Sequence, residues 1–103
     1  MIVAGFGLRT TATRDSLEAA LALTAARFAA KVTDLAVVAD KADLPAIRNL
    51  AAATGLPLHA VALPSVAEAA ALAVAGAGGI LIQTRLISPD GLATVAIAEG
   101  TGL

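Results

Sequence analysis

Two kinds of apolar pattern alternate along this chain of 103 residues. Short continuous apolar runs, bounded by glycine, proline or polar residues, are typical of strands that are buried on both faces of a sheet. Such runs predict five strands, at residues 1–6, 35–38, 58–62, 80–86 and 93–98. The turn sequence Ser88-Pro89-Asp90-Gly91 separates the last two, so we expect those strands to form a hairpin.

The segments between the first four strands carry apolar residues at the spacing of amphipathic helices. Thr13 is the expected N-cap of the first helix, whose apolar stripe reaches Phe28. Asp43 is the expected cap of the second helix, with Pro45 in the first turn. Gly55 follows the last apolar position of this helix and is its expected C-terminal stop.

A third helix is predicted from the capping-box pattern Ser65-Val66-Ala67-Glu68, and it is expected to end near Gly76. The resulting order is βαβαβαββ within a single domain covering residues 1–103. Strands separated by helices predict parallel pairing, with helices on both faces of the sheet. We therefore expect an α/β three-layer sandwich with a mostly parallel sheet, to which the C-terminal hairpin adds an antiparallel strand.

The composition narrows the possible functions without identifying one. Hydrophobic residues make up 58% of the chain, but glycine and proline interrupt the long uncharged stretches, so no transmembrane helix is expected. No basic residue precedes the first apolar run, so we expect no secretory signal and a cytoplasmic location. The net charge of −1 and the near absence of aromatic residues argue against nucleic-acid binding.

Metal and cofactor chemistry is limited by the same composition. The chain has no cysteine, which excludes disulfides, a thiolate nucleophile and a cysteine metal site. His59 is the single histidine, so a histidine-rich metal site cannot form within one chain. We therefore expect no metal and no cofactor. In its apolar strand, His59 is expected to be a packed residue rather than a catalyst.

Three loops are expected to meet at the carboxyl edge of the sheet, where open α/β sheets bind their ligands. Each loop leads into the N-terminus of a helix, whose free amides and partial positive charge attract anions. Arg9 in the first loop and Lys41 in the second add full positive charges. This edge is therefore suited to a ligand that carries carboxylates or phosphates.

The first loop begins Gly5-Phe6-Gly7, as dinucleotide-binding loops do, but Thr10 occupies the position of their third glycine. Since that glycine is needed for close packing of the helix, we reject a dinucleotide site. Two interpretations remain open: a loop that binds a ligand through Arg9 and neighbouring hydroxyls, and a simple polar connection between strand and helix. On the first interpretation the ligand-binding residues are Gly5, Gly7, Arg9, Thr10, Thr11 and Thr13.

The second and third loops offer further candidates. Lys41 could hold a carboxylate while Asp40 acts as a base, but the alternative, a capping Asp43 beside two solvated charges, is favoured from this loop alone. Ser65 is another candidate ligand contact, although capping explains both Ser65 and Glu68. No catalytic triad is evident, and Asp40 is the remaining candidate base.

These loops also carry a family resemblance. The chain resembles the CobE family and the C-terminal domain of CbiG, whose first loop runs roughly G-x-G-C-R-x-G-x-[ST] after a strand. Leu8 replaces the cysteine and Thr11 the third glycine of that pattern, Ala39 and Leu44 replace acidic residues, and Arg85 replaces a lysine. The matching positions are Gly5, Gly7, Arg9, Thr13, Lys41, the run 64–72 and the strand 94–98.

The resemblance implies a role in cobalamin biosynthesis, on a corrinoid precursor edged with acetate and propionate groups. The leading hypothesis is an accessory or carrier protein that binds a precorrin-type intermediate, with other corrin-pathway enzymes as further partners. One alternative is a lactone-opening enzyme similar to cobalt-precorrin-5A hydrolase, with Asp40 or Glu68 activating water. Another, unrelated to corrinoids, is a phosphate-binding α/β module.

Overall fold

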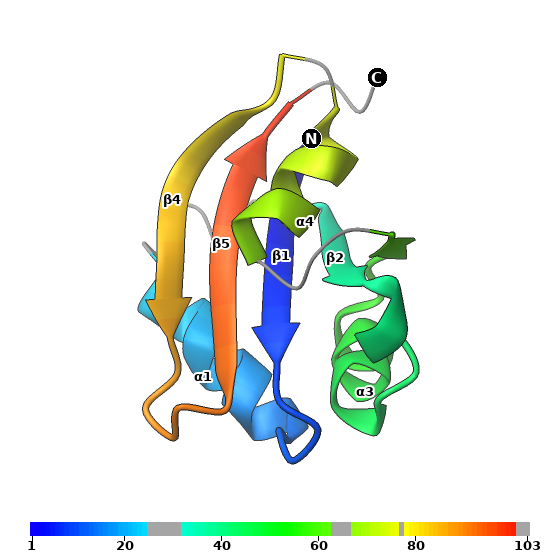
Figure 1. Cartoon of the computed structure of the whole chain (residues 1–103), viewed down its shortest axis with the longest axis vertical. Coiled ribbons are helices and arrows are strands. Elements are labelled where there is room, and N and C mark those ends of the chain that lie inside the picture. Colours follow the sequence, from blue (N-terminus) through cyan, green and yellow to red (C-terminus); the bar gives the residue numbers. More distant parts are fainter. Residues whose placement is uncertain (25–31, 63–66, 77, 101–103) are drawn as a thin grey trace.

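The computed structural model describes residues 1–24, 32–62, 67–76 and 78–100, and it contains the five strands and three helices expected from the sequence (Figure 1). In chain order the elements are β1 (Ile2–Leu8), α1 (Arg14–Leu23), β2 (Asp34–Val38), the short 3₁₀ turn η1 (Ala39–Lys41), α3 (Pro45–Thr54), β3 (Leu58–Val61), α4 (Ala67–Ala75), β4 (Ile80–Ile87) and β5 (Ala93–Glu99). Each strand begins and ends within two residues of its predicted bounds. Phe28, expected in the first helix, lies outside the described residues.

The five strands form one mixed sheet in the order β3-β2-β1-β5-β4. β1, β2 and β3 are parallel, and β5 runs antiparallel to both of its neighbours. The predicted hairpin is thus confirmed, and its second strand is inserted beside β1. As a result β4 runs in the same direction as β1, and the β4–β5 turn lies at the carboxyl edge of the parallel strands.

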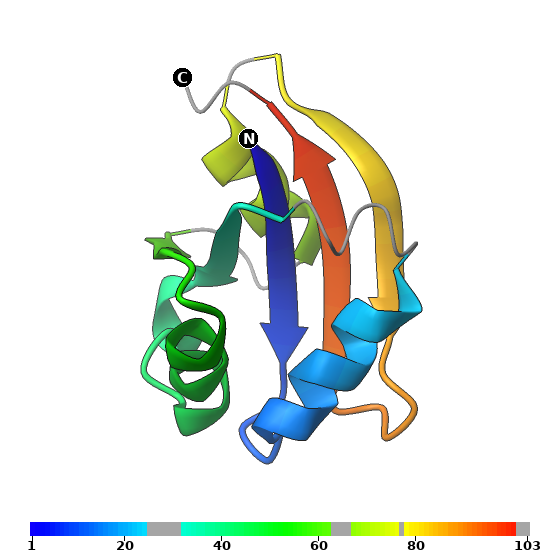
Figure 2. The same ribbon diagram turned by 180° about the vertical axis from the view of Figure 1, so that it is seen from behind.

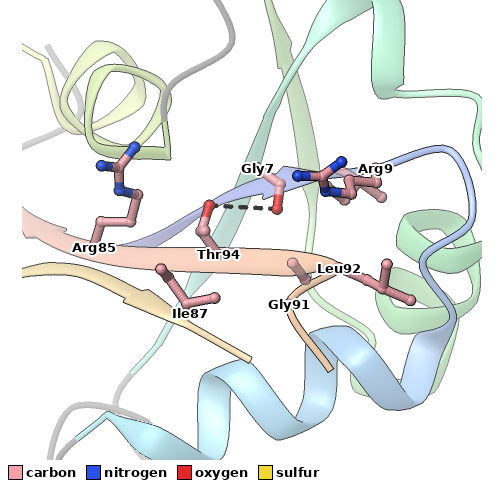
Figure 3. A pocket seen from close by; sticks show the side chains of 9 residues that line it. Gly7, Arg9, Arg85, Ile87, Gly91, Leu92 and Thr94 are labelled. Atoms are coloured by element: carbon pink, nitrogen blue, oxygen red, sulfur yellow. Dashed lines mark hydrogen bonds between the residues drawn. The ribbon is translucent and has the colours of Figure 1, made fainter. Parts of the chain in front are cut away.

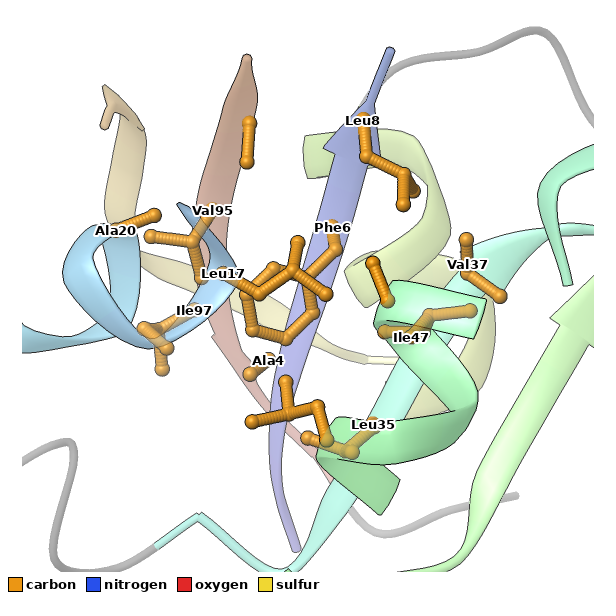
Figure 4. Close-up of a cluster of buried hydrophobic side chains, with 13 residues drawn as sticks. Ala4, Phe6, Leu8, Leu17, Ala20, Leu35, Val37, Ile47, Val95 and Ile97 are labelled. Carbon is orange, nitrogen blue, oxygen red and sulfur yellow. The ribbon is translucent and has the colours of Figure 1, made fainter. Parts of the chain in front are cut away.

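Helices cover both faces of the sheet, as the sequence predicts. α1 and α3 lie on one face and α4 on the other (Figures 1 and 2). The core beneath α1 and α3 contains the larger side chains, including Phe6, Leu17 and Ile47 (Figure 4). Because side chains alternate along a strand, Val3, Gly5 and Gly7 of β1 face α4 instead.

The interface between α4 and the sheet is built from small residues. Ala71 and Ala75 pack against Val3 and Ala36, and all four are fully buried. A methyl group on Gly5 would lie only 2.6 Å from the backbone nitrogen of Ala71. The absence of a side chain at Gly5 is therefore what allows α4 to approach β1 so closely.

Of the four predicted helix ends that fall on described residues, three agree with the structure, and one of these is the end of α4 at Ala75, directly before Gly76. Thr13 caps α1 through reciprocal hydrogen bonds with Ser16, and Gly55 ends α3 with a φ of 70°. The prediction that Asp43 caps α3 is wrong. Pro45 is the first residue of the helix, so the N-cap is the residue before it, Leu44. Asp43 instead accepts a 2.6 Å hydrogen bond from Arg48 at the surface.

The predicted capping box of α4 is not part of the described structure. Ser65 and the side chain of Glu68 lie outside the described residues. Among the helices that the structure does describe, none is long and apolar enough to cross a membrane.

Candidate functional site

A cavity of about 450 Å³ opens at the carboxyl edge, between the end of β1 and the β4–β5 hairpin (Figure 3). Residues from three neighbouring strands form it because β5 is inserted between β1 and β4. Among the residues that the structure describes, its lining contains two arginines and no acidic residue. The lining residues are Gly7, Leu8, Arg9, Arg85, Ile87, Gly91, Leu92, Ala93 and Thr94.

The floor of the cavity is the junction of β1 and β5. Gly7 is paired with Thr94, whose hydroxyl donates a long 3.4 Å hydrogen bond to the Gly7 carbonyl. A methyl group on Gly7 would lie 2.7 Å from that hydroxyl oxygen and 4.0 Å from the backbone nitrogen of Ala67, the first residue of α4. The glycine therefore leaves room over the floor, on the face of the sheet that carries α4.

Two positive charges flank this floor. Arg9 follows β1 and Arg85 belongs to β4, and in Figure 3 their guanidinium groups lie on either side of the Gly7–Thr94 hydrogen bond. Both arginines are exposed, and neither forms an ion pair with a described residue. Guanidinium groups bind carboxylates and phosphates through paired hydrogen bonds, so the cavity is suited to an anionic ligand.

The backbone of Arg9 is held in place by the hairpin. Its amide donates a 2.9 Å hydrogen bond to the carbonyl of Leu92. The turn itself follows the prediction made from its sequence, since the Gly91 amide donates to the Ser88 carbonyl and Gly91 has a φ of 71°. The side of the cavity formed by Gly91 and Leu92 is therefore fixed relative to Arg9.

A second set of hydrogen bonds ties this turn to the start of α1. The buried hydroxyls of Ser16 and Ser88 each donate a 2.6 Å hydrogen bond to the carboxylate of Asp90, and the Leu92 amide donates another of 3.0 Å. These donors stabilise the charged carboxylate, so the hydrogen bond from Ser16, followed by those from Ser88 and Leu92, lowers the pKa of Asp90. Asp90 is thus a structural link behind the cavity.

The structure separates the candidate residues of the first loop into groups. Gly7 and Arg9 line the cavity. Gly5 is buried beneath α4, and the Thr13 side chain is engaged in capping α1. The remaining candidates, Thr10 and Thr11, are exposed residues of the loop outside the cavity lining.

The second loop is placed apart from the cavity. Lys41 is half-buried at the end of η1 and Asp40 is exposed, and neither belongs to the lining. The described structure therefore does not bring Lys41 into the same cavity as Arg9. Ser65, the candidate in the third loop, lies outside the described residues.

Sequence reasoning missed the contribution of the hairpin to this site. Arg85, Ile87, Leu92 and Thr94 come within reach of Arg9 because β5 pairs with β1. The turn sequence predicts that β4 and β5 pair with each other, but it contains no signal for which strand β5 joins on its other side.

A second polar cluster lies near the opposite end of the sheet. Nε2 of His59 is 2.7 Å from a carboxylate oxygen of Asp34, whose other oxygen accepts a 2.7 Å hydrogen bond from Thr33. Burial raises the pKa of Asp34, but the hydrogen bonds from Thr33 and His59 outweigh it and leave that pKa below its usual value. The expectation of a packed histidine is wrong, because β3 is an edge strand and the side chain of His59 is 41% exposed.

The solved structures that match this chain include two proteins of cobalamin biosynthesis. The cobalamin biosynthesis protein chiG from Agrobacterium tumefaciens is 34% identical, with a TM-score of 0.81, over 98% of this chain and 99% of that one. This chain belongs to the CobE/CbiG family of cobalamin biosynthesis proteins. CobE, from the cobalamin (vitamin B12) biosynthetic pathway, is 26% identical with a TM-score of 0.82, over 100% of this chain and 92% of that one.

The resemblance inferred from the sequence is therefore confirmed at the level of the family. No protein-family model matches the sequence, and comparison with curated proteins likewise gives no match. The matches to chiG and CobE extend over the whole sheet, so the CobE/CbiG fold includes the hairpin that completes the cavity.

Proposed function

We propose that this chain acts in cobalamin biosynthesis as an accessory or carrier protein that binds a precorrin-type intermediate. The family supports the pathway, because chiG and CobE, two solved structures similar to this chain, are cobalamin biosynthesis proteins. The ligand would be a polycarboxylate and would occupy the cavity between β1 and the hairpin. As a carrier, the protein would pass this ligand to other enzymes of the corrin pathway.

The observation that carries the proposal is the pair of arginines around a cavity whose described lining residues include no carboxylate. Two guanidinium groups on one side of a sheet repel each other weakly and gain when an anion lies between them. A macrocycle edged with acetate and propionate groups offers several carboxylates at once. It can therefore contact Arg9 and Arg85 together.

The cavity also suits one side of a large ligand better than the whole of it. Its volume of about 450 Å³ lies within the range of small-molecule sites. We propose that the macrocycle enters by one edge and leaves its far side in solvent. A ligand held in this way remains accessible to a second protein, as a carrier requires.

The test is a titration of the purified protein with a precorrin-type intermediate, followed through the visible spectrum of the macrocycle. Arg9→Ala should weaken binding by about 1.5–3 kcal/mol, or roughly 10- to 150-fold, which is the range for a charge-assisted hydrogen bond. The sequence predicts a similar loss for Lys41→Ala, whereas the position of Lys41 outside the cavity predicts a smaller one. Lys41→Ala is thus the matched control for a general loss of positive charge.

Two results would count against the proposal. If the wild-type protein leaves the spectrum unchanged at millimolar concentration, then no such ligand binds. If the wild type binds but Arg9→Ala binds equally well with its fold intact, the ligand does not occupy this cavity.

A further inference from the structure

Ile87 is an unusual residue for a cationic cavity. It lies at the end of β4, two residues after Arg85, and it is 59% exposed. Single exposed aliphatic residues are common on protein surfaces and by themselves need no explanation. Ile87 differs because it belongs to the lining of the cavity, together with the half-buried Leu92.

The position of Ile87 relative to the arginines follows from the register of the sheet. Ile87 is paired with Thr94, and Thr94 is paired with Gly7, so the three residues form one row across the floor. Arg85 and Arg9 stand on either side of this row in Figure 3. Along this direction the cavity therefore presents the guanidinium group of Arg85, the apolar side chain of Ile87 and the guanidinium group of Arg9.

This order of groups distinguishes between two kinds of anion. A small hydrophilic ion such as phosphate would use a guanidinium group and gain nothing from the sec-butyl side chain of Ile87, which displaces water without replacing its hydrogen bonds. A ring that carries carboxylates on its rim would bury the exposed part of Ile87 while its carboxylates reach the arginines.

We infer that Ile87 determines the specificity of the cavity for a flat amphipathic ligand, with carboxylates separated by an apolar ring, over phosphate and small polar carboxylates. This inference rests on the proposed function, since it concerns the same cavity. Ile87, supported by Leu92, is the contact surface for the ring, and Arg9 and Arg85 are the contacts for its carboxylates.

The chain offers a matched control on the same strand. Ile80 begins β4 and is 66% exposed, but it does not line this cavity. Ile80→Ser and Ile87→Ser remove the same side chain from two similarly exposed positions of one edge strand. Effects on strand formation or solubility should therefore be similar in the two variants, and a difference in binding reports the cavity.

The experiment measures the affinity of each variant for uroporphyrin, a stable polycarboxylate tetrapyrrole, and for citrate and inorganic phosphate. We expect Ile87→Ser to weaken uroporphyrin binding about 3- to 10-fold, as partial exposure of one aliphatic contact predicts, and to leave citrate and phosphate binding unchanged. Ile87→Leu should retain the wild-type affinity for uroporphyrin, because it keeps an aliphatic side chain at this position. Ile80→Ser should leave all three affinities unchanged. Urea unfolding of each variant checks that the fold is retained.

The outcomes separate this inference from the proposed function. If uroporphyrin binds to the wild type and to Ile87→Ser equally, the inference is overturned while a polycarboxylate-binding function stands. An equal loss for Ile80→Ser and Ile87→Ser would also overturn it, because the effect would then belong to the strand. If the wild type binds phosphate but no tetrapyrrole, both the inference and the proposed function are overturned.

Discussion

Gly5 lies beneath α4, and one added methyl group there tests how this helix is held against the sheet. In Gly5→Ala the new carbon would lie 2.6 Å from the Ala71 nitrogen and 2.8 Å from the Ala71 methyl group, and it would also overlap the carbonyl oxygen of Ala67. Carbon atoms in contact are normally about 3.5–4.0 Å apart. Two of these three neighbours are helix backbone, so no side-chain rotation can relieve the overlap.

The magnitude follows from what must move. To restore normal contacts, α4 would have to shift by roughly 1 Å, which would disturb the packing of Ala71 and Ala75 on the sheet. Overpacking of a core costs about 1–3 kcal/mol, and the backbone neighbours put Gly5→Ala at or above the upper end. The gain from replacing a flexible glycine, about 0.4–1 kcal/mol, offsets only part of that cost. We expect a net loss of about 2–3 kcal/mol.

The assay is urea unfolding followed by far-ultraviolet circular dichroism, because the chain has no tryptophan or tyrosine to report by fluorescence. With an m-value of about 1–3 kcal/mol per molar urea, this loss lowers the unfolding midpoint by roughly 1–3 M. Gly7→Ala is the matched control, since its new methyl group meets only the hydroxyl of Thr94, which can rotate away. Its midpoint should change much less.

A Gly5→Ala midpoint equal to that of the wild type, or equal to that of Gly7→Ala, would refute the close packing of α4 on β1. The comparison also bears on the site, because the sequence groups both glycines as ligand contacts. If Gly5 acts only in packing, Gly5→Ala should change stability, and Gly7→Ala should change ligand binding.

Two further predictions concern single carboxylates. Asp90→Ala should lower the urea midpoint at pH 7, because it removes the link between α1 and the hairpin. The folded-state pKa of Asp90 is lowered, so its stabilisation is present above about pH 3.8 and is lost as the pH falls through the folded-state pKa. The difference in midpoint between wild type and variant should therefore shrink at lower pH. Equal midpoints at pH 7 would contradict this role. Asp40 is exposed, so we expect this chain alone not to open a cobalt-precorrin lactone above the uncatalysed rate, measured by the acetaldehyde that lactone-opening proteins of the CbiG type release. Release above that rate that disappears in Asp40→Asn would show that the chain is a catalyst.

Local features of the fold could be predicted because they depend on short stretches of sequence. The continuous apolar runs identified all five strands, and the cap at Thr13 and the stop at Gly55 were read from single residues with defined backbone preferences. The prediction that Asp43 caps α3 is wrong because the preference of Pro45 for the first helical position outweighs the preference of aspartate for the cap. The structure shows that the proline determines the start of the helix.

The candidate site depended more on long-range pairing and was therefore predicted only in part. Gly7 and Arg9 line the cavity, as their place at the end of the first strand suggested. Arg85 could not be placed from the sequence, because its proximity to Arg9 requires β5 to pair with β1. The exposure of His59 could not be predicted for the same reason, since the exposure of a strand residue depends on whether its strand is central or at an edge.

The insertion of β5 beside β1 has a consequence for how the chain folds. Ile2 pairs with Glu99 and Leu8 with Ala93, so the centre of the sheet joins β1 to β5, the strands of this sheet that lie farthest apart in the sequence. Pairings between such distant segments close slowly, because the chain must lose the entropy of a long loop before any contact is gained. Until β5 has been synthesised, one edge of β1 has no partner strand in this sheet. We therefore expect this domain to complete its folding only after translation of β5, and we expect substitutions that weaken β5 to reduce the yield of soluble protein through aggregation of the unfinished sheet.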